Sequence, residues 1–294
     1  MNSSYPSPVD KLLAFGDCRK FRHWPDYLAL GFGPEHIDDL IRMTTDEALN
    51  TAQSDTLDVW APIHALRTLG QLRAEAAIQP LLELFDSTEP DDNYLVIAFS
   101  EVMGKIGPAA IPALTAFLAD PAHGLYPRTY AGDSLAKIGE QHPEAREECI
   151  RSIVATLENF EENAAELNGF LIANMLDLDA IEAAPVIERA FAADRVDESI
   201  AGDWEDVQIN LGLIESRKSK RRNSILDRLF SSDQKDAGVW DDDEGEVGDF
   251  TIAPTGNVQN PHSQRSQAGK LKLKNRRAMA RKSRRINRKK RKKK

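Results

Sequence analysis

Apolar residues recur at the spacing of an amphipathic helix in four short stretches of this chain. The spacing i, i+3, i+4, i+7 is clearest at residues 78–85 and 150–157, and it is thinner at 111–118 and 184–191. Residues three or four apart lie on one side of a helix, so each stretch predicts a helix with one buried side. The stretches follow one another at similar intervals, which indicates a repeated structural unit.

Each of these helices is preceded by another apolar stretch that ends in a recurring five-residue motif. The motif reads LGQLR at 69–73, MGKIG at 103–107, LAKIG at 135–139 and MLDLD at 175–179, with offsets of 34, 32 and 40 residues. A unit of two helices leaves one apolar side in water unless a neighbouring unit covers it. The sequence therefore predicts an all-α fold, an α-solenoid in which helix pairs stack into a right-handed superhelix.

The segments on either side of the repeats are expected to cap the stack. Near the N-terminus, prolines that begin and glycines that end short apolar stretches predict helices at 8–15, 25–30 and 34–43, and we expect Thr44 or Thr45 to cap the helix that follows. The predicted organisation is N-terminal capping helices at 1–56, repeats at 57–193, C-terminal capping helices at 194–230, an acidic disordered linker at 231–269 and a polybasic tail at 270–294.

The repeat sequences resemble a known family. The segments LGQLRAEAAIQPLLELF, MGKIGPAAIPALTAFL and PRTYAGDSLAKIG are similar to the short HEAT-type repeats of bacterial proteins, including the group named after phycobilisome lyases. Such repeats often carry an arginine at the start of the first helix, where Arg128 fits and residues 91–99 have none. The resemblance implies an armadillo-like scaffold whose groove binds a protein partner. Some related proteins end in a SEC-C zinc motif, whose cysteines this chain lacks.

The same resemblance leaves a second function open, because lyase-like members of the family attach or detach bilins. The chain would then be a HEAT-type phycobilin lyase or a tetrapyrrole chaperone. Its residues offer such chemistry little beyond acids on the second helices, since there is no G-x-S-x-G nucleophile motif, no glycine-rich phosphate loop and no metal-ligand spacing among six histidines and two cysteines. We therefore expect no cofactor and favour a non-enzymatic scaffold over an enzyme.

Charge is distributed very unevenly along the chain. The formal net charge is -9, yet residues 270–294 contain sixteen Lys or Arg and no acid, which leaves 22 bases and 47 acids in residues 1–269. Positive charge at this density matches the phosphates of a nucleic acid. The candidate nucleic-acid-binding residues are Lys270, Lys272, Lys274, Arg276, Arg277, Arg281, Lys282, Arg284, Arg285, Arg288, Lys289, Lys290, Arg291, Lys292, Lys293 and Lys294.

The tail has no aromatic residue, so it offers phosphate contacts without base stacking. RNA, the ribosome or DNA is therefore its expected partner. Two alternatives stay open. The tail could fold back on the acidic body, because a flexible linker of 39 residues spans about 31–37 Å, or it could contact an anionic membrane with Leu271, Leu273 and Ile286 to insert.

The chain carries no signal for secretion or membrane insertion. It has no uninterrupted run of about 18 apolar residues and no signal peptide. The sequence therefore predicts a soluble, cytoplasmic adaptor that binds a protein through the solenoid and a nucleic acid through the tail.

Overall fold

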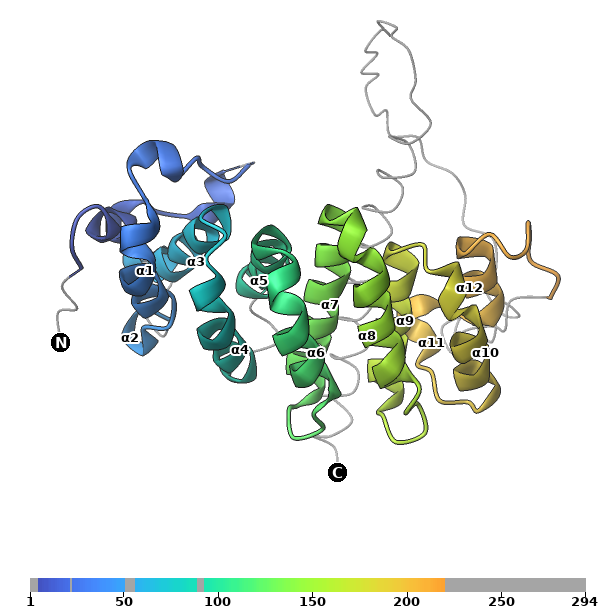
Figure 1. Cartoon of the computed structure of the whole chain (residues 1–294). Coiled ribbons are helices and arrows are strands. Elements are labelled where there is room, and N and C mark those ends of the chain that lie inside the picture. The colour runs from blue at the N-terminus through green and yellow to red at the C-terminus, as the bar shows by residue number, and fades with distance from the viewer. Residues whose placement is uncertain (1–4, 22, 51–55, 89–92, 220–294) are drawn as a thin grey trace, which may run out of the picture.

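The computed structural model describes residues 5–21, 23–50, 56–88 and 93–219, and every regular element within them is a helix (Figure 1). The predicted all-α character is therefore confirmed for these residues. The acidic linker, the polybasic tail and the end of the predicted C-terminal cap lie outside them.

Between residues 61 and 192, the described helices form four pairs. The first helices are α3 (Ala61–Gln71), α5 (Asn93–Ile106), α7 (Leu125–Gln141) and α9 (Ala165–Asp177), and the second helices are α4 (Ile78–Ser87), α6 (Ile111–Ala119), α8 (Arg146–Leu157) and α10 (Ala184–Ala192). Each first helix packs against the next first helix and each second helix against the next second helix (Figure 1). The helix pairs are present in the predicted order and form two layers.

The recurring five-residue motif makes the turn inside three of the four described pairs, whereas in the third pair the copy at 135–139 lies within α7. Its last residue has a left-handed backbone at Arg73, Gly107 and Asp179, with φ of 52°, 90° and 49°. The next amide closes the first helix, as where Ala74 N donates to the carbonyl of Leu69 at 3.1 Å. A 3₁₀ turn then leads into each described second helix, at η6 (Glu75–Ala77), η7 (Pro108–Ala110), η8 (Pro143–Ala145) and η9 (Ile181–Ala183).

The core of the stack runs across the helix pairs. Phe85 of α4 is fully buried, and its ring centroid lies 4.6 Å from that of Phe99, 5.7 Å from that of Phe117 and 5.9 Å from that of Tyr130. These partners come from α5, α6 and α7, so one side chain joins three successive pairs. Such contacts explain why a single pair is not expected to fold alone.

Glycine lets adjacent first helices approach closely. A Cβ atom at Gly132 of α7 would lie 2.7 Å from Asn174 Nδ2 of α9, and one at Gly70 of α3 would lie 3.0 Å from Val102 Cγ2 of α5. No side chain fits at these positions without moving its neighbour.

Arginine side chains tie the pairs together through main-chain carbonyls. Arg146 Nε donates to the carbonyl of Leu178 at 2.9 Å, so the start of α8 is bonded to the end of α9. Arg128 Nε donates to the carbonyl of Leu118 at 2.8 Å, which joins α7 to the end of α6. These bonds satisfy carbonyls at helix ends, where the helix itself supplies no donor.

The N-terminal segment is less regular than its prolines and glycines predicted. The expected helices at 8–15 and 25–30 are short 3₁₀ turns, and the one at 34–43 begins as 3₁₀ before it becomes α-helical. The elements are η1 (Val9–Ala14), η2 (Cys18–Lys20), η3 (Leu28–Leu30), η4 (Pro34–His36), α1 (Ile37–Thr44), α2 (Glu47–Asn50) and η5 (Asp58–Trp60).

The predicted cap of α2 was wrong. Asp46 Oδ1 accepts hydrogen bonds from the amides of Ala48 and Leu49 at 3.0 and 3.3 Å. The hydroxyls of Thr44 and Thr45 instead donate to carbonyls one turn earlier in α1. An aspartate directly before the helix is the better acceptor for its first amides, since its carboxylate also favours the positive end of the helix dipole.

Two short helices follow the last pair, α11 (Glu198–Ala201) and α12 (Trp204–Asn210). Val207 of α12 is fully buried, and the ring of Trp204 lies 5.9 Å from that of Phe191 on α10. Trp204 therefore contacts the last pair through α10.

Candidate binding surface

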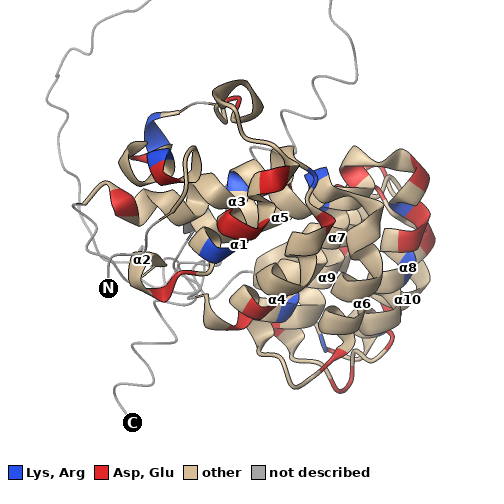
Figure 2. Cartoon of the chain, turned by 60° about the vertical axis from the view of Figure 1, so that its left-hand side comes forward, with Lys and Arg blue, Asp and Glu red and all other residues tan. Residues whose placement is uncertain are grey.

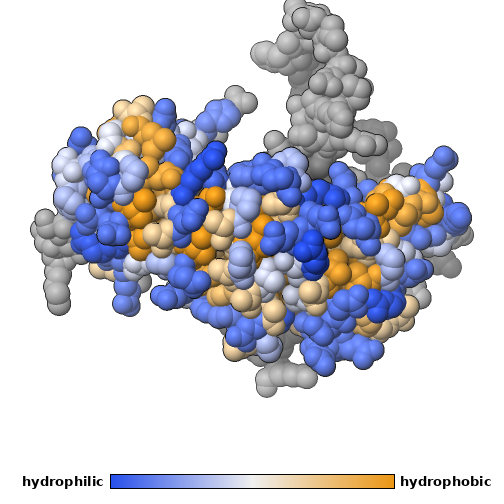
Figure 3. All heavy atoms as spheres, viewed as in Figure 1, coloured by the Kyte–Doolittle hydropathy of each residue, from blue (hydrophilic) through white to orange (hydrophobic). Residues whose placement is uncertain are grey.

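The second helices present an outward side whose centre carries no charge. The α6 sequence IPALTAFLA has no ionisable residue, and its exposed positions are Pro112, Ala116 and Ala119. In Figure 2, α6 is uncharged, whereas α4 carries acids and α8 carries both acids and bases. In Figure 3, apolar and hydrophilic patches alternate on the side of the molecule shown there.

Of the helices that flank α6, α4 carries two acids and no base, whereas α8 carries two acids and two bases, Arg146 and Arg151. Their exposed carboxylates belong to Glu83 and Asp86 on α4 and to Glu147 and Glu148 on α8, with Glu158 directly after α8. Glu158 is paired with Arg189 of α10 at 2.7 Å, which bridges two successive second helices. An uncharged centre with a charged rim resembles the composition of protein interfaces.

A cavity of about 260 Å³ opens between α6 and α8. Its walls are mostly polar, and the hydroxyl oxygens of Thr115 and Ser152 lie 2.8 Å apart across the two helices. The other lining residues are Ala119, Pro121, Arg128, Ala155, Thr156, Asn159, Glu162 and Asn163. The cavity interrupts the uncharged surface with a small polar site.

Arg128 is the only basic residue that lines this cavity. It lies in the first turn of α7 and is 9% exposed, because the loops that follow α6 and α8 surround it. Its Nη2 donates to Asn163 Oδ1 at 3.4 Å, in addition to the bond from Nε to Leu118. Burial lowers the pKa of Arg128 from its ordinary value, and the charge of nearby Asp120 partly opposes this shift.

A second cavity, of about 300 Å³, lies at the ends of the first helices. Arg73, Lys105 and His142 line it, together with Asp26 and Leu28 of the N-terminal segment. His142 Nε2 lies 2.9 Å from the carbonyl of Gly104 and can donate to it. The cavity combines bases from three successive pairs with an acid of the N-terminal cap.

His64 is not placed to act as a general base for an external substrate. It is fully buried, its Nδ1 lies 2.6 Å from the Tyr27 hydroxyl, and its Nε2 lies 2.8 Å from the carbonyl of Gly16. Burial lowers the pKa of His64 to about 4. Cys18 is also buried, and burial raises the pKa of its thiol.

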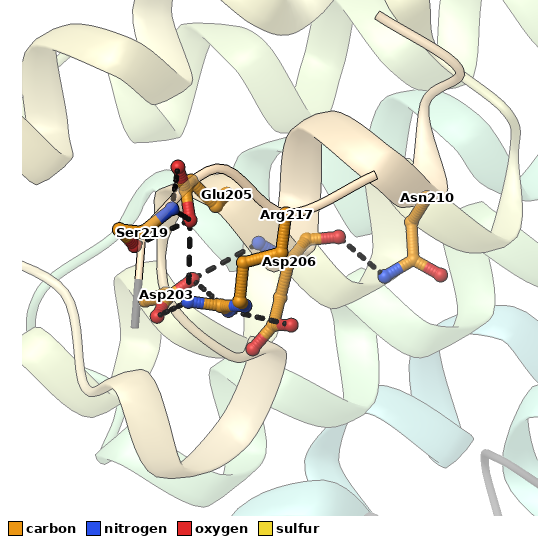
Figure 4. Close-up of polar contacts among 6 residues, drawn as sticks. All are labelled: Asp203, Glu205, Asp206, Asn210, Arg217 and Ser219. Atoms are coloured by element: carbon orange, nitrogen blue, oxygen red, sulfur yellow. Dashed lines mark hydrogen bonds and ion pairs between the residues drawn. The ribbon is translucent and has the colours of Figure 1, made fainter. Parts of the chain in front are cut away.

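The described chain ends in an acidic clasp around Arg217 (Figure 4). The guanidinium of Arg217 pairs with Asp203 at 2.7 Å, Asp206 at 2.8 Å and Glu205 at 3.4 Å, all at the start of α12. Ser219 Oγ donates to Glu205 at 2.5 Å, a bond that lowers the pKa of this carboxyl group. The clasp therefore fixes the point from which the remaining 75 residues, 220–294, depart.

Two further observations concern metals and membranes. Within the described ranges, no group of three or more His, Cys, Asp or Glu side chains is arranged to hold a metal ion. In the same part of the chain, no single helix is long and apolar enough to cross a bilayer, and only the bent pair Leu95–Ile106 and Pro108–Ala119 passes the length and composition test.

Sequence reasoning did not find the polar cavity. The sixteen basic residues predicted to bind nucleic acid, Lys270 to Lys294, lie outside the described residues, so their placement stays a prediction. Arg128 was noted only for its resemblance to a family arginine. Nothing in the sequence indicated that Thr115 and Ser152, 37 residues apart, meet beside it.

Residues 63–87, which span most of α3 and α4, match the family described as PBS lyase HEAT-like repeat. No curated protein and no solved structure matches the chain significantly. The matched segment is the first of the four described helix pairs, and the three that follow repeat its helix, turn and helix construction. The chain therefore contains a HEAT-like repeat at residues 63–87, followed by three described helix pairs of the same construction.

Proposed function

We propose that this protein is a non-enzymatic cytoplasmic adaptor. Its helix pairs form a right-handed solenoid that binds a protein partner through the second helices, and its tail contacts the phosphates of RNA, the ribosome or DNA. The protein-binding part of this proposal is supported by the uncharged side of α6, which lies between the acidic helix α4 and the helix α8, whose charges are mixed. A partner that fits this surface has a small apolar centre, basic groups where it meets α4 and both acidic and basic groups where it meets α8.

The protein-binding half is tested by charge substitutions on α6. Ala116→Arg places a cation at the centre of the proposed interface, whereas Ala109→Arg places one at an exposed site before α6 and serves as the matched control. Proteins captured from lysate by the unaltered chain should be lost with Ala116→Arg and retained with Ala109→Arg. Equal capture by both variants would place the interface elsewhere.

The nucleic-acid half follows from the charge of residues 270–294. If six to ten of these side chains contact phosphates, affinity for single-stranded RNA falls by about 10³ to 10⁵ between 50 and 200 mM salt. Fluorescence anisotropy with the full chain and with a chain ending at residue 269 measures this loss. The proposal would be refuted if the shortened chain bound RNA as tightly as the full chain and also bound duplex DNA as tightly as the full chain.

A second candidate places the tail on the acidic body or on an anionic membrane. The Arg217 clasp favours the first of these, because it is a contact between a basic segment and acids of the C-terminal cap. If the acids at 241–246 compete with nucleic acid for the tail, then their deletion raises RNA affinity at low salt. Binding of the tail to anionic vesicles, but not to RNA, would favour the membrane.

The lyase alternative is supported by the description of the matched family. A phycobilin lyase or tetrapyrrole chaperone would change the absorbance of an added bilin and keep this activity without residues 270–294. An adaptor would leave the spectrum unchanged and would lose its cellular location on removal of the tail.

A further inference from the structure

We propose that the cavity between α6 and α8 is a receptor for one carboxylate group of the protein partner, with Arg128 as the residue that binds it. This inference rests on the proposed function, because the cavity opens within the second-helix surface. It adds the chemical class of the group that the surface recognises.

The first argument is that some N–H donors of the Arg128 guanidinium have no acceptor within the described residues. A guanidinium carries five N–H donors and no acceptor. Within the described residues, Arg128 donates from Nε to the carbonyl of Leu118 and from Nη2 to Asn163 Oδ1, and its Nη1 donates to no protein acceptor. The Nη2 contact is long, at 3.4 Å. Arg128 lines the cavity, so its remaining donors give it hydrogen-bonding capacity for a ligand there.

The second argument is that the charge of Arg128 is buried without a counterion. The residue is nine-tenths buried, and no carboxylate of the described chain forms an ion pair with it. Asp120 is near enough to favour the charged guanidinium, but its Oδ1 accepts the amide of Ala122 at 2.8 Å. A buried charge gains most from an anion that reaches it, because the surrounding protein screens the attraction weakly.

The size and surroundings of the cavity select a carboxylate among possible anions. A volume of about 260 Å³ accommodates one side chain or chain terminus and is small for a nucleotide or a tetrapyrrole. The exposed Glu162, which lines the cavity, and Asp120 near Arg128 repel a doubly charged phosphate more than a singly charged carboxylate. The hydroxyl of Thr156, which also lines the cavity, can donate to the second carboxylate oxygen, whereas the Ser152 hydroxyl already donates to the carbonyl of Glu148 at 3.1 Å.

The test uses a blocked glutamate, N-acetyl-glutamate amide, as the probe and N-acetyl-glutamine amide as its neutral control. Side-chain amide signals of Asn159 and Asn163 are followed by NMR in the full chain, because both residues line the cavity. The blocked glutamate should shift these signals saturably, and the blocked glutamine should not. Equal shifts from both probes, or from neither, would overturn the proposal, since only water would then satisfy Arg128.

Variants at the edge of the cavity keep the test independent of folding. Ala155 is exposed and lines the cavity, and its side chain makes no hydrogen bond. Ala155→Glu should therefore lower the affinity for the blocked glutamate by about tenfold through repulsion, whereas Ala155→Gln should leave this affinity unchanged. Arg128→Gln should abolish the shifts, with circular dichroism to check folding. Unchanged binding to Ala155→Glu would place the probe elsewhere.

The source of the carboxylate is settled by competition. If the group belongs to the partner, then Ala155→Glu reduces partner capture and excess blocked glutamate competes with the partner. Saturable probe binding that leaves capture unchanged would overturn the assignment to the partner while the proposed function, tested by Ala116→Arg, still stands. Tighter binding of inorganic phosphate than of blocked glutamate would overturn the choice of carboxylate.

Discussion

The hydroxyl of Tyr27 lies 2.6 Å from Nδ1 of His64, and the other ring nitrogen of His64 lies 2.8 Å from the carbonyl of Gly16. A carbonyl can only accept, so Nε2 carries the proton and Nδ1 accepts from Tyr27. The bonds therefore hold neutral His64 between two parts of the N-terminal segment. A second proton on the imidazole would oppose the Tyr27 bond inside a buried site.

This arrangement predicts that the protein loses stability in mild acid. The pKa of His64 is about 4 in the folded chain, against about 6.5 when exposed, so the unfolded chain binds more protons between these values. The contribution of neutral His64 to the free energy of unfolding is fully present above pH 6.5. It is lost as the pH falls towards 4, by about 3 kcal/mol in total. In urea unfolding, His64→Gln should reduce the dependence of the unfolding free energy on pH between 4 and 6.5.

The control for this prediction is His23→Gln, at an exposed histidine of the same segment. It should leave the pH dependence of the unfolding free energy as it is in the unaltered chain. An identical slope for His64→Gln and the unaltered chain between pH 4 and 6.5 would contradict the buried neutral imidazole.

Gly132→Ala should loosen the stack of first helices. The added methyl group would lie 2.7 Å from Asn174 Nδ2, so the buried Asn174 side chain must move within the contact between α7 and α9, at a cost of about 1–3 kcal/mol in unfolding free energy. Gly124→Ala is the matched control, because its Cβ would meet only Pro127 at 3.6 Å. Chemical denaturation of both variants measures the difference, and equal stability would argue against close packing of α7 on α9.

Phe85→Ala should destabilise several pairs at once. The ring contacts aromatic residues of three other helices, and its removal should cost about 3–5 kcal/mol because a large cavity remains. Ile181→Ala, at a side chain that is 51% exposed, should change stability by less than about 0.5 kcal/mol. A small effect of Phe85→Ala in thermal unfolding would mean that the pairs are not joined through this ring.

Arg217→Gln should release the segment that follows α12. The glutamine cannot pair with three carboxylates, so the amide of Ser219, which donates to Glu205 at 3.1 Å, should exchange its hydrogen severalfold faster. Lys218→Gln, at an exposed position, is the control. Hydrogen exchange monitored by mass spectrometry reads out both variants, and protection that survives in Arg217→Gln would show that the clasp does not hold the segment.

The helices of the repeats could be predicted from sequence because they depend on local periodicity. Positions such as Ile78 and Phe85 lie one or two turns apart, and their burial follows from helical geometry alone. The 3₁₀ turns near the N-terminus were missed because proline and glycine mark where a segment begins and ends without fixing its hydrogen-bond pattern. The Arg128 cavity depends on which residues of different pairs meet, and no local spacing encodes that.

The arginine ties between pairs have a consequence for how this protein can diverge. Arg146 and Arg128 donate to the carbonyls of Leu178 and Leu118, and every amino acid presents a carbonyl at those places. A mutation at either acceptor position therefore leaves the cross-link chemically intact. Substitutions can therefore change the outward side chains, and with them the partner that binds. The spacing between successive helix pairs stays the same.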